Sequence, residues 1–161
     1  MNLGFSARND SASRVNASTP SPHVDPDPQE ASRALMSFND HANSPHVIHI
    51  DQERFEQEVI LASRELPVLV DFWADWCAPC HQLAPHLHRV VDELAGAIRL
   101  AKVEVDAGEN MKLAGHFRLR GFPTVILFHD GEERGRFSGS RSSHQIRAWL
   151  QEHLGAGDAA A

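Results

Sequence analysis

The chain contains 161 residues, of which 42% are hydrophobic and 23% charged, so it can bury one sizeable core and its length gives no reason to expect two domains. Its formal net charge of −7 comes with acidic and basic residues interspersed, which argues against a basic face for nucleic acid and against a polybasic membrane anchor. No stretch approaches the roughly 18 apolar residues of a membrane span, and the N-terminus lacks both regions of a secretory signal.

Residues 1–45 differ in composition from the rest of the chain. They are rich in serine and proline and hold only scattered apolar side chains, so they bury too little to offset the entropy of ordering, and we expect a disordered extension. Arg8 and Arg14 among serines are a weak sign of a transit segment for an organelle such as the mitochondrion, but the nearby acidic residues argue against it. We therefore expect a cytoplasmic protein.

The first half of the remaining chain predicts a strand, a helix and a second strand. Residues 47–50 favour a short strand, and Asp51 can cap the following helix. Its apolar face consists of Phe55, Val59 and Ile60. Residues 68–74 are mostly apolar at consecutive positions, as expected of a central strand covered on both faces. Asp71 is the exception inside that strand.

The second half continues the alternation. A helix with apolar residues at helical period runs from Cys77 to a stop at Gly96, and Pro85 inside it is expected to cause a kink. The later elements are a strand at 98–105, a short helix at 111–117, strands at 124–128 and 134–137, and a terminal helix ending near 154. The predicted order is β-α-β-α-β-α-β-β-α, an α/β domain over 46–155 with a frayed tail at 156–161.

The two cysteines, Cys77 and Cys80, lie three positions apart at the end of the buried strand and the start of a helix. Unpaired backbone N–H groups and the helix dipole stabilise a thiolate at that place, so Cys77 suits thiol–disulfide exchange. Cys80, inside the first turn, is expected to be more buried and to need help in losing its proton. Asp71 is the candidate base, because desolvation of a carboxylate in an apolar strand raises its pKa.

From about 47 to 154 the chain resembles the thioredoxin family. The resemblance rests on several motifs in order: Val70-Asp71-Phe72-Trp73-Ala74, Trp76-Cys77-x-Pro79-Cys80, Pro85, Ala101-Lys102 through Asp106, Gly121-Phe122-Pro123-Thr124, Asp130-Gly131 and Gly139. The family fold, a central mixed β-sheet flanked by helices, agrees with the predicted element order.

This resemblance implies a role for each residue of the site. It makes Cys77 the nucleophile that attacks a substrate disulfide, Cys80 the resolving thiol, and Lys102 the electrostatic partner of Asp71. It also implies a cis Pro123 against the dithiol, although the sequence does not show the isomer. The expected substrate surface consists of Trp76, Ala78, Pro79, Phe122, Pro123 and Gly139, with Trp73 packed beneath. Gly139 fits an ordinary turn before the last helix equally well.

The implied activity is that of a protein disulfide reductase. The expected partners are disulfide-containing proteins and thioredoxin reductase, an NADPH-linked flavoprotein, while the chain itself binds no cofactor and is a monomer. Two residues depart from the usual family pattern: Ala78 replaces the common glycine, and His81 the common lysine. Because residues around the cysteines tune the reduction potential, a disulfide oxidant or isomerase of the same fold stays open.

Three alternatives lie further from this interpretation. Cys77-Ala78-Pro79-Cys80-His81 also matches the attachment pattern of c-type haem, but the chain offers no export signal and only Met111 as an easy distal ligand. Zinc would need four converging ligands, and His81, His86 and His88 do not share one helix face with both thiols. A redox-assisted chaperone or binding module also remains open, although nothing in the dithiol motif has been lost.

Overall fold

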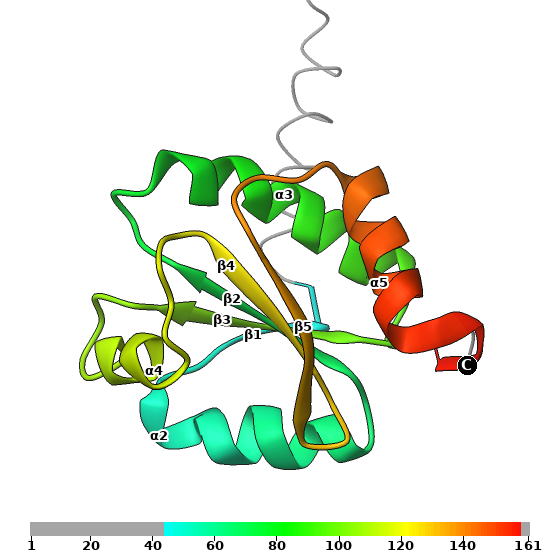
Figure 1. The fold of residues 1–161 in the computed structure, drawn as a ribbon, viewed down its shortest axis with the longest axis horizontal. Coiled ribbons are helices and arrows are strands. Elements are labelled where there is room, and N and C mark those ends of the chain that lie inside the picture. Colours follow the sequence, from blue (N-terminus) through cyan, green and yellow to red (C-terminus); the bar gives the residue numbers. More distant parts are fainter. Residues whose placement is uncertain (1–43, 159–161) are drawn as a thin grey trace, which may run out of the picture.

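The computed structural model describes residues 44–158, so nearly all of the extension predicted at 1–45 and the last residues of the tail lie outside the described range. The described chain forms a single sheet with helices on both sides (Figure 1). Within this range no helix is long and apolar enough to cross a membrane.

The elements follow the predicted order. The strands are β1 (Val47–His49), β2 (Val68–Trp73), β3 (Arg99–Glu104), β4 (Thr124–His129) and β5 (Glu132–Ser138). The helices are α2 (Gln52–Phe55), which continues as a π segment η2 (Glu56–Leu61) and a 3-10 turn η3 (Ala62–Arg64), then α3 (Ala78–Glu93), α4 (Met111–His116) and α5 (Ser143–Asp158). Hydrophobic periodicity predicted a helix after Asp51 but not its change of hydrogen-bond pattern.

The sheet is mixed, as predicted. Its strands lie in the order β1-β3-β2-β4-β5, with β1, β3 and β2 parallel and β4 and β5 antiparallel to their neighbours. Strand β2 therefore sits at the centre, and every side chain from Val68 to Phe72 is buried. A run of consecutive apolar residues predicted this position, because a strand covered on both faces has no polar side.

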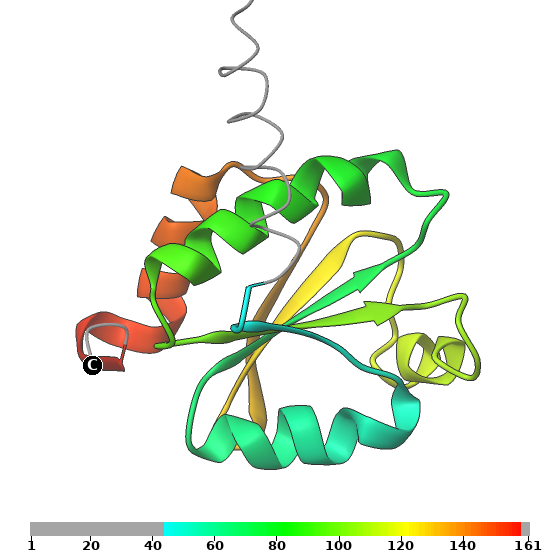
Figure 2. The same ribbon diagram turned by 180° about the vertical axis from the view of Figure 1, so that it is seen from behind.

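Helices cover both faces of the sheet. In Figures 1 and 2, α3 and α5 lie on one face and α2 and α4 on the other. The core is divided accordingly: Leu69 and Leu83 belong to the cluster under α3 and α5, and Val70 and Phe55 to the cluster under α2 and α4. Side chains alternate along β2, so Asp71 shares the face of Leu69, the face covered by α3.

Helix α3 begins at the dithiol and runs without interruption through Pro85. Its buried face consists of Cys80, Leu83, Leu87, Val90 and Val91. Because these residues repeat at helical period, the whole helix packs on the sheet and fixes the position of its N-terminus relative to β2. The dithiol is thus held by a long element rather than by a loop.

Helix α5 approaches the edge strand β5 closely at Gly135. The ring of His153 packs against Trp149, with centroids 4.5 Å apart, and its Nδ1 lies 2.8 Å from the Trp149 carbonyl oxygen. A Cβ atom at Gly135 would come within 2.3 Å of this ring. Gly135 is therefore required for a close approach between helix and strand.

We expect Gly135→Ala to lower the free energy of unfolding by about 1–3 kcal/mol, the usual cost of overpacking, because the His153 ring must leave its place against Trp149. Urea unfolding measures the change. Gly115→Ala in α4 is the matched control, since its Cβ would meet no atom within 4 Å and alanine favours a helix. Equal stability of Gly135→Ala and the parent chain would contradict the prediction.

Candidate active site

The dithiol lies where β2 ends and α3 begins. Cys77 is the N-cap of α3, and its Sγ accepts a hydrogen bond from the backbone N–H of Cys80 at 3.3 Å. The Cys77 N–H donates to the Ala74 carbonyl at 3.1 Å, which closes the turn between strand and helix. The N-terminus of a helix carries a partial positive charge. This charge stabilises a negatively charged sulfur at the N-cap, so the geometry favours the thiolate form of Cys77.

Cys77 and Cys80 are joined by a disulfide, with their Cα atoms 5.3 Å apart. The sequence predicted that Cys80 would be the more buried of the two, but the exposed fractions are 4% for Cys77 and 3% for Cys80. The contrast is absent in this oxidised state because the S–S bond draws both sulfurs to the same place.

Asp71 is a buried carboxylate with one basic partner. Its Oδ2 lies 3.9 Å from the Nζ of Lys102, the residue opposite it on β3, and its Oδ1 has no hydrogen-bond partner within residues 44–158. Burial raises the pKa of Asp71 from 3.8 to about 6, although the Lys102 charge acts in the other direction. A carboxylate that titrates near neutrality can exchange protons at working pH.

Trp73 connects this pair to the start of α3. The Lys102 Nζ lies 5.0 Å from the centroid of the Trp73 ring, a cation–π contact. On the same indole the ring of His81 packs edge-on at 6.2 Å, and the His81 Nε2 lies 2.6 Å from the carbonyl oxygen of Asp75. His81 therefore ties the turn before Cys77 to the first turn of α3.

Trp76 is the most exposed large apolar side chain at the site. It is 67% exposed, and its Nε1 donates to the carboxylate of Asp106. Its ring meets that of Phe122 edge-on, with centroids 6.2 Å apart. The Phe122–Pro123 peptide is cis, which the sequence left undecided. The ring contact joins the turn that carries Trp76 and Cys77, called the dithiol turn below, to the loop that carries Phe122 and Pro123, called the proline loop.

The remaining predicted substrate residues differ in exposure. Ala78 and Pro79 are exposed at the start of α3, and Pro123 is buried. The N–H of Gly139 donates to the Pro123 carbonyl at 3.0 Å, and Gly139 has φ +84 with open space where a Cβ would point. The positive φ agrees with a turn that favours glycine, and the contact of Gly139 with a substrate peptide stays a prediction.

Sequence reasoning missed Asp106 as a residue that orients the site. Asp106 lies 30 positions from Trp76, in the turn after β3, and no periodicity or local motif links the two. Parallel strands place their C-terminal ends at the same edge of a sheet, so the turns after β2 and β3 become neighbours. That placement, applied to the predicted strands, was the signal that could have found Asp106.

The histidines of α3 do not gather around the thiols. His86 lies 3.0 Å from the Ser143 hydroxyl of α5, and His81 contacts the Asp75 carbonyl. Across residues 44–158 no group of three His, Cys, Asp or Glu side chains converges as a metal site would. The described side chains therefore do not support the zinc alternative.

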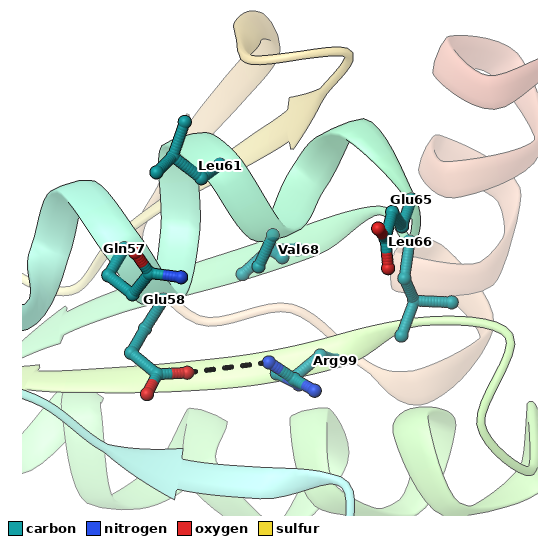
Figure 3. Close-up of a pocket in the computed structure, with 8 residues that line it drawn as sticks. Gln57, Glu58, Leu61, Glu65, Leu66, Val68 and Arg99 are labelled. Atoms are coloured by element: carbon teal, nitrogen blue, oxygen red, sulfur yellow. Dashed lines mark ion pairs between the residues drawn. The ribbon is translucent and has the colours of Figure 1, made fainter.

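A polar hollow of about 440 Å³ lies at the opposite end of the sheet, where β2 and β3 begin (Figure 3). Glu58 from η2 and Arg99 from β3 form an ion pair across it, with N and O 3.5 Å apart, and Leu61 lies on its rim. It holds no nucleophile and no part of the dithiol surface, so we assign the chemistry to the cysteine end.

The arrangement suits one kind of reaction. A disulfide sits at the N-terminus of a helix, a buried carboxylate with a pKa near neutrality lies on the strand that leads to it, and an exposed apolar surface with a cis-proline loop surrounds it. Together with the five-stranded mixed sheet, these features define a thiol–disulfide oxidoreductase with a thioredoxin fold.

Comparisons with known proteins agree. The family model for thioredoxin matches residues 46–152. A thioredoxin of Acidithiobacillus ferridurans is 38% identical over 111 residues, and one of Pseudomonas aeruginosa is 36% identical over 111; each alignment covers 69% of this chain and 99% of the relative. A thioredoxin of Allochromatium vinosum is 38% identical over 110 residues, 68% of this chain and 99% of that protein. The chain belongs to the thioredoxin family and is a thiol–disulfide oxidoreductase that acts by dithiol–disulfide exchange.

We expect Asp71→Asn to stabilise the oxidised protein at high pH and not at low pH. With a pKa raised from 3.8 to about 6, the ionised carboxylate costs the folded state about 3 kcal/mol once both folded and unfolded chains are ionised. The gain should therefore be absent below about pH 4, grow between pH 4 and 6, and stay constant above that.

Urea unfolding at a series of pH values measures this difference. Asp75→Asn, which removes an exposed carboxylate from the turn before Cys77, is the matched control for the loss of one negative charge. A stability gain for Asp71→Asn that is the same at pH 4 and pH 8 would contradict the assigned pKa.

Proposed function

We propose that the chain reduces exposed disulfides of protein substrates and is returned to its dithiol form by an NADPH-linked flavoprotein, thioredoxin reductase. The observation that carries this proposal is the Cys77 sulfur at the N-cap of α3, bordered by the exposed Trp76 and the cis-Pro123 loop. A protein disulfide can approach such an apolar surface without displacing the core.

The reaction balances in two exchange steps. In the dithiol form, the Cys77 thiolate attacks one sulfur of the substrate disulfide; that S–S bond breaks, a substrate thiolate leaves, and a mixed disulfide forms. Cys80 then attacks the Cys77 sulfur, which releases the second substrate thiolate and leaves the Cys77–Cys80 disulfide. Two electrons pass to the substrate, and the two protein thiols provide the two protons.

Asp71 is proposed to accept the Cys80 proton in the second step. Its carboxylate is buried on the sheet face that α3 covers, and its raised pKa lets it take up and release a proton near neutral pH. Lys102 keeps part of the carboxylate population ionised at that pH, because its positive charge lowers the Asp71 pKa against the effect of burial.

The electron donor and the monomeric state are proposed from the family. Relatives covered over 99% of their length are thioredoxins, which supports the flavoprotein reductase as electron donor and a monomer that binds no cofactor of its own. A cytoplasmic location is proposed on the sequence pattern of a single C-x-x-C pair.

A disulfide oxidant is the second candidate, because His81 replaces the lysine that usually follows the second cysteine and its ring packs at the start of α3. Residues around the cysteines tune the reduction potential. Equilibration with glutathione buffers decides between the two. A potential below the cytosolic glutathione poise of about −220 to −260 mV supports the reductase, and a clearly higher one supports the oxidant.

We expect Cys77→Ser to abolish turnover and Cys80→Ser to trap substrate as a mixed disulfide, because only the second variant keeps the attacking thiol. Non-reducing gels with an oxidised protein substrate, followed by mass spectrometry of the trapped bond, measure the outcome. Trapping by Cys77→Ser instead of Cys80→Ser would reverse the assigned order of attack. Thiol-independent activity that survives loss of both cysteines would favour a binding module.

A further inference from the structure

Two arginines next to the proline loop have no ionic partner in the described chain. Arg118 and Arg120 are both exposed, and neither forms an ion pair or a side-chain hydrogen bond with another residue of 44–158. They lie in the segment that leads from α4 to β4 (Figure 1). Arg120 is two positions before Phe122, the residue whose ring meets Trp76 of the dithiol turn.

These arginines line a hollow whose other residues include the sequence neighbours of two predicted substrate residues, Pro123 and Gly139. The hollow measures about 180 Å³ and is lined by Arg118, Leu119, Arg120, Thr124, Arg136 and Ser138; we call it the arginine hollow. Thr124 directly follows Pro123, and Ser138 directly precedes Gly139. Pockets for drug-sized molecules usually measure about 300–1,000 Å³, so the arginine hollow has room for a side chain but not for a cofactor.

The third arginine of the hollow, Arg136, is held in place by hydrogen bonds. Both Nε and Nη2 of Arg136 donate to the Glu133 carboxylate at 2.6 Å, and its Nη1 donates to the Phe117 carbonyl at 2.8 Å. Its charge is therefore already balanced by Glu133. The unbalanced positive charge of the hollow belongs to Arg118 and Arg120, in a chain whose net charge is −7.

Arg118 occupies a backbone position better suited to glycine. Its N–H donates to the Gly115 carbonyl and that of Leu119 to the Ala114 carbonyl, so it ends α4 in the left-handed conformation, with φ +54. Glycine is the usual residue there, because a Cβ is disfavoured at positive φ. The arginine thus adds charge beside the site at a conformational cost, although that charge also has a favourable interaction with the end of α4.

We propose that Arg118 and Arg120 select protein substrates that carry acidic residues beside the disulfide to be reduced. An arginine guanidinium pairs with a carboxylate through two parallel hydrogen bonds, and both guanidiniums are free to do so. A substrate lying across Trp76 and the Pro123 loop would bring its flanking residues over the arginine hollow. This inference rests on the proposed reductase function and names its preferred substrate class.

The test compares two disulfide-linked peptides that differ only in three flanking residues, Glu in one and Gln in the other. The three residues are placed on either side of the cysteine in turn. We expect the reduced protein to show a kcat/KM higher for the Glu peptide in at least one placement by about threefold to tenfold at low salt, as two exposed charge pairs allow. The preference should shrink as salt rises toward 1 M, where the Debye length is only about 3 Å.

The Arg118→Gly variant distinguishes the effect of the arginine charge on substrate preference from any effect on folding. It removes the guanidinium at a position that favours glycine, so we expect an unfolding midpoint no lower than that of the parent and a preference reduced by about threefold. Arg120→Gln should reduce the preference similarly, and Arg118→Lys should keep most of it. Arg89→Gln, an equal charge change on exposed α3 surface away from the hollow, is the matched control and should keep it fully.

The outcomes separate this inference from the proposed function. Equal kcat/KM on Glu and Gln peptides in both placements, or a preference that survives in the Arg118→Gly/Arg120→Gln double variant, would overturn the substrate selection while leaving the reductase intact. Failure to reduce either peptide would instead count against the proposed function. An equal loss of activity on both peptides in Arg118→Gly would mean that Arg118 serves the fold of the loop and not selection.

Discussion

The burial of β2 at the centre of the sheet is the constraint on which the site depends. Because the strand is covered on both faces, its last residues cannot shift, and the turn that follows places Cys77 at the N-terminus of α3. Packing of α3 over its full length holds that N-terminus in place. The same burial gives Asp71 its raised pKa. One structural feature therefore positions Cys77 and also sets the pKa of Asp71, the proton acceptor that we propose for Cys80.

The site combines this rigid base with an exposed surface. The ring contact between Trp76 and Phe122 and the link from Gly139 to the Pro123 carbonyl join three segments that are distant in sequence. The segment of Trp76 also carries the dithiol, and the three together form the face at which we propose that a protein substrate binds. A buried, costly carboxylate and an arginine in a glycine-like conformation both lie near this face, as expected where function opposes stability.

Much of the fold could be predicted because its signals are local. Consecutive apolar residues indicated the central position of β2, helical periodicity indicated α3 and α5, and Asp130-Gly131 indicated the hairpin between β4 and β5. The π segment η2 escaped prediction, since period alone does not distinguish one helical hydrogen-bond pattern from another. Equal burial of the two cysteines was also missed, because it follows from the closed disulfide.

The sequence by itself determined the chemistry of this protein, since two cysteines three apart at a strand-to-helix boundary and one acidic residue in an apolar strand are local features. Only the tertiary structure decided which distant groups surround them. The pairing of Asp106 with Trp76, the contact of Lys102 with Trp73 and the arginine hollow beside Pro123 all depend on which strands are neighbours. Strand order is set by the packing of the whole sheet, and no local pattern encodes it.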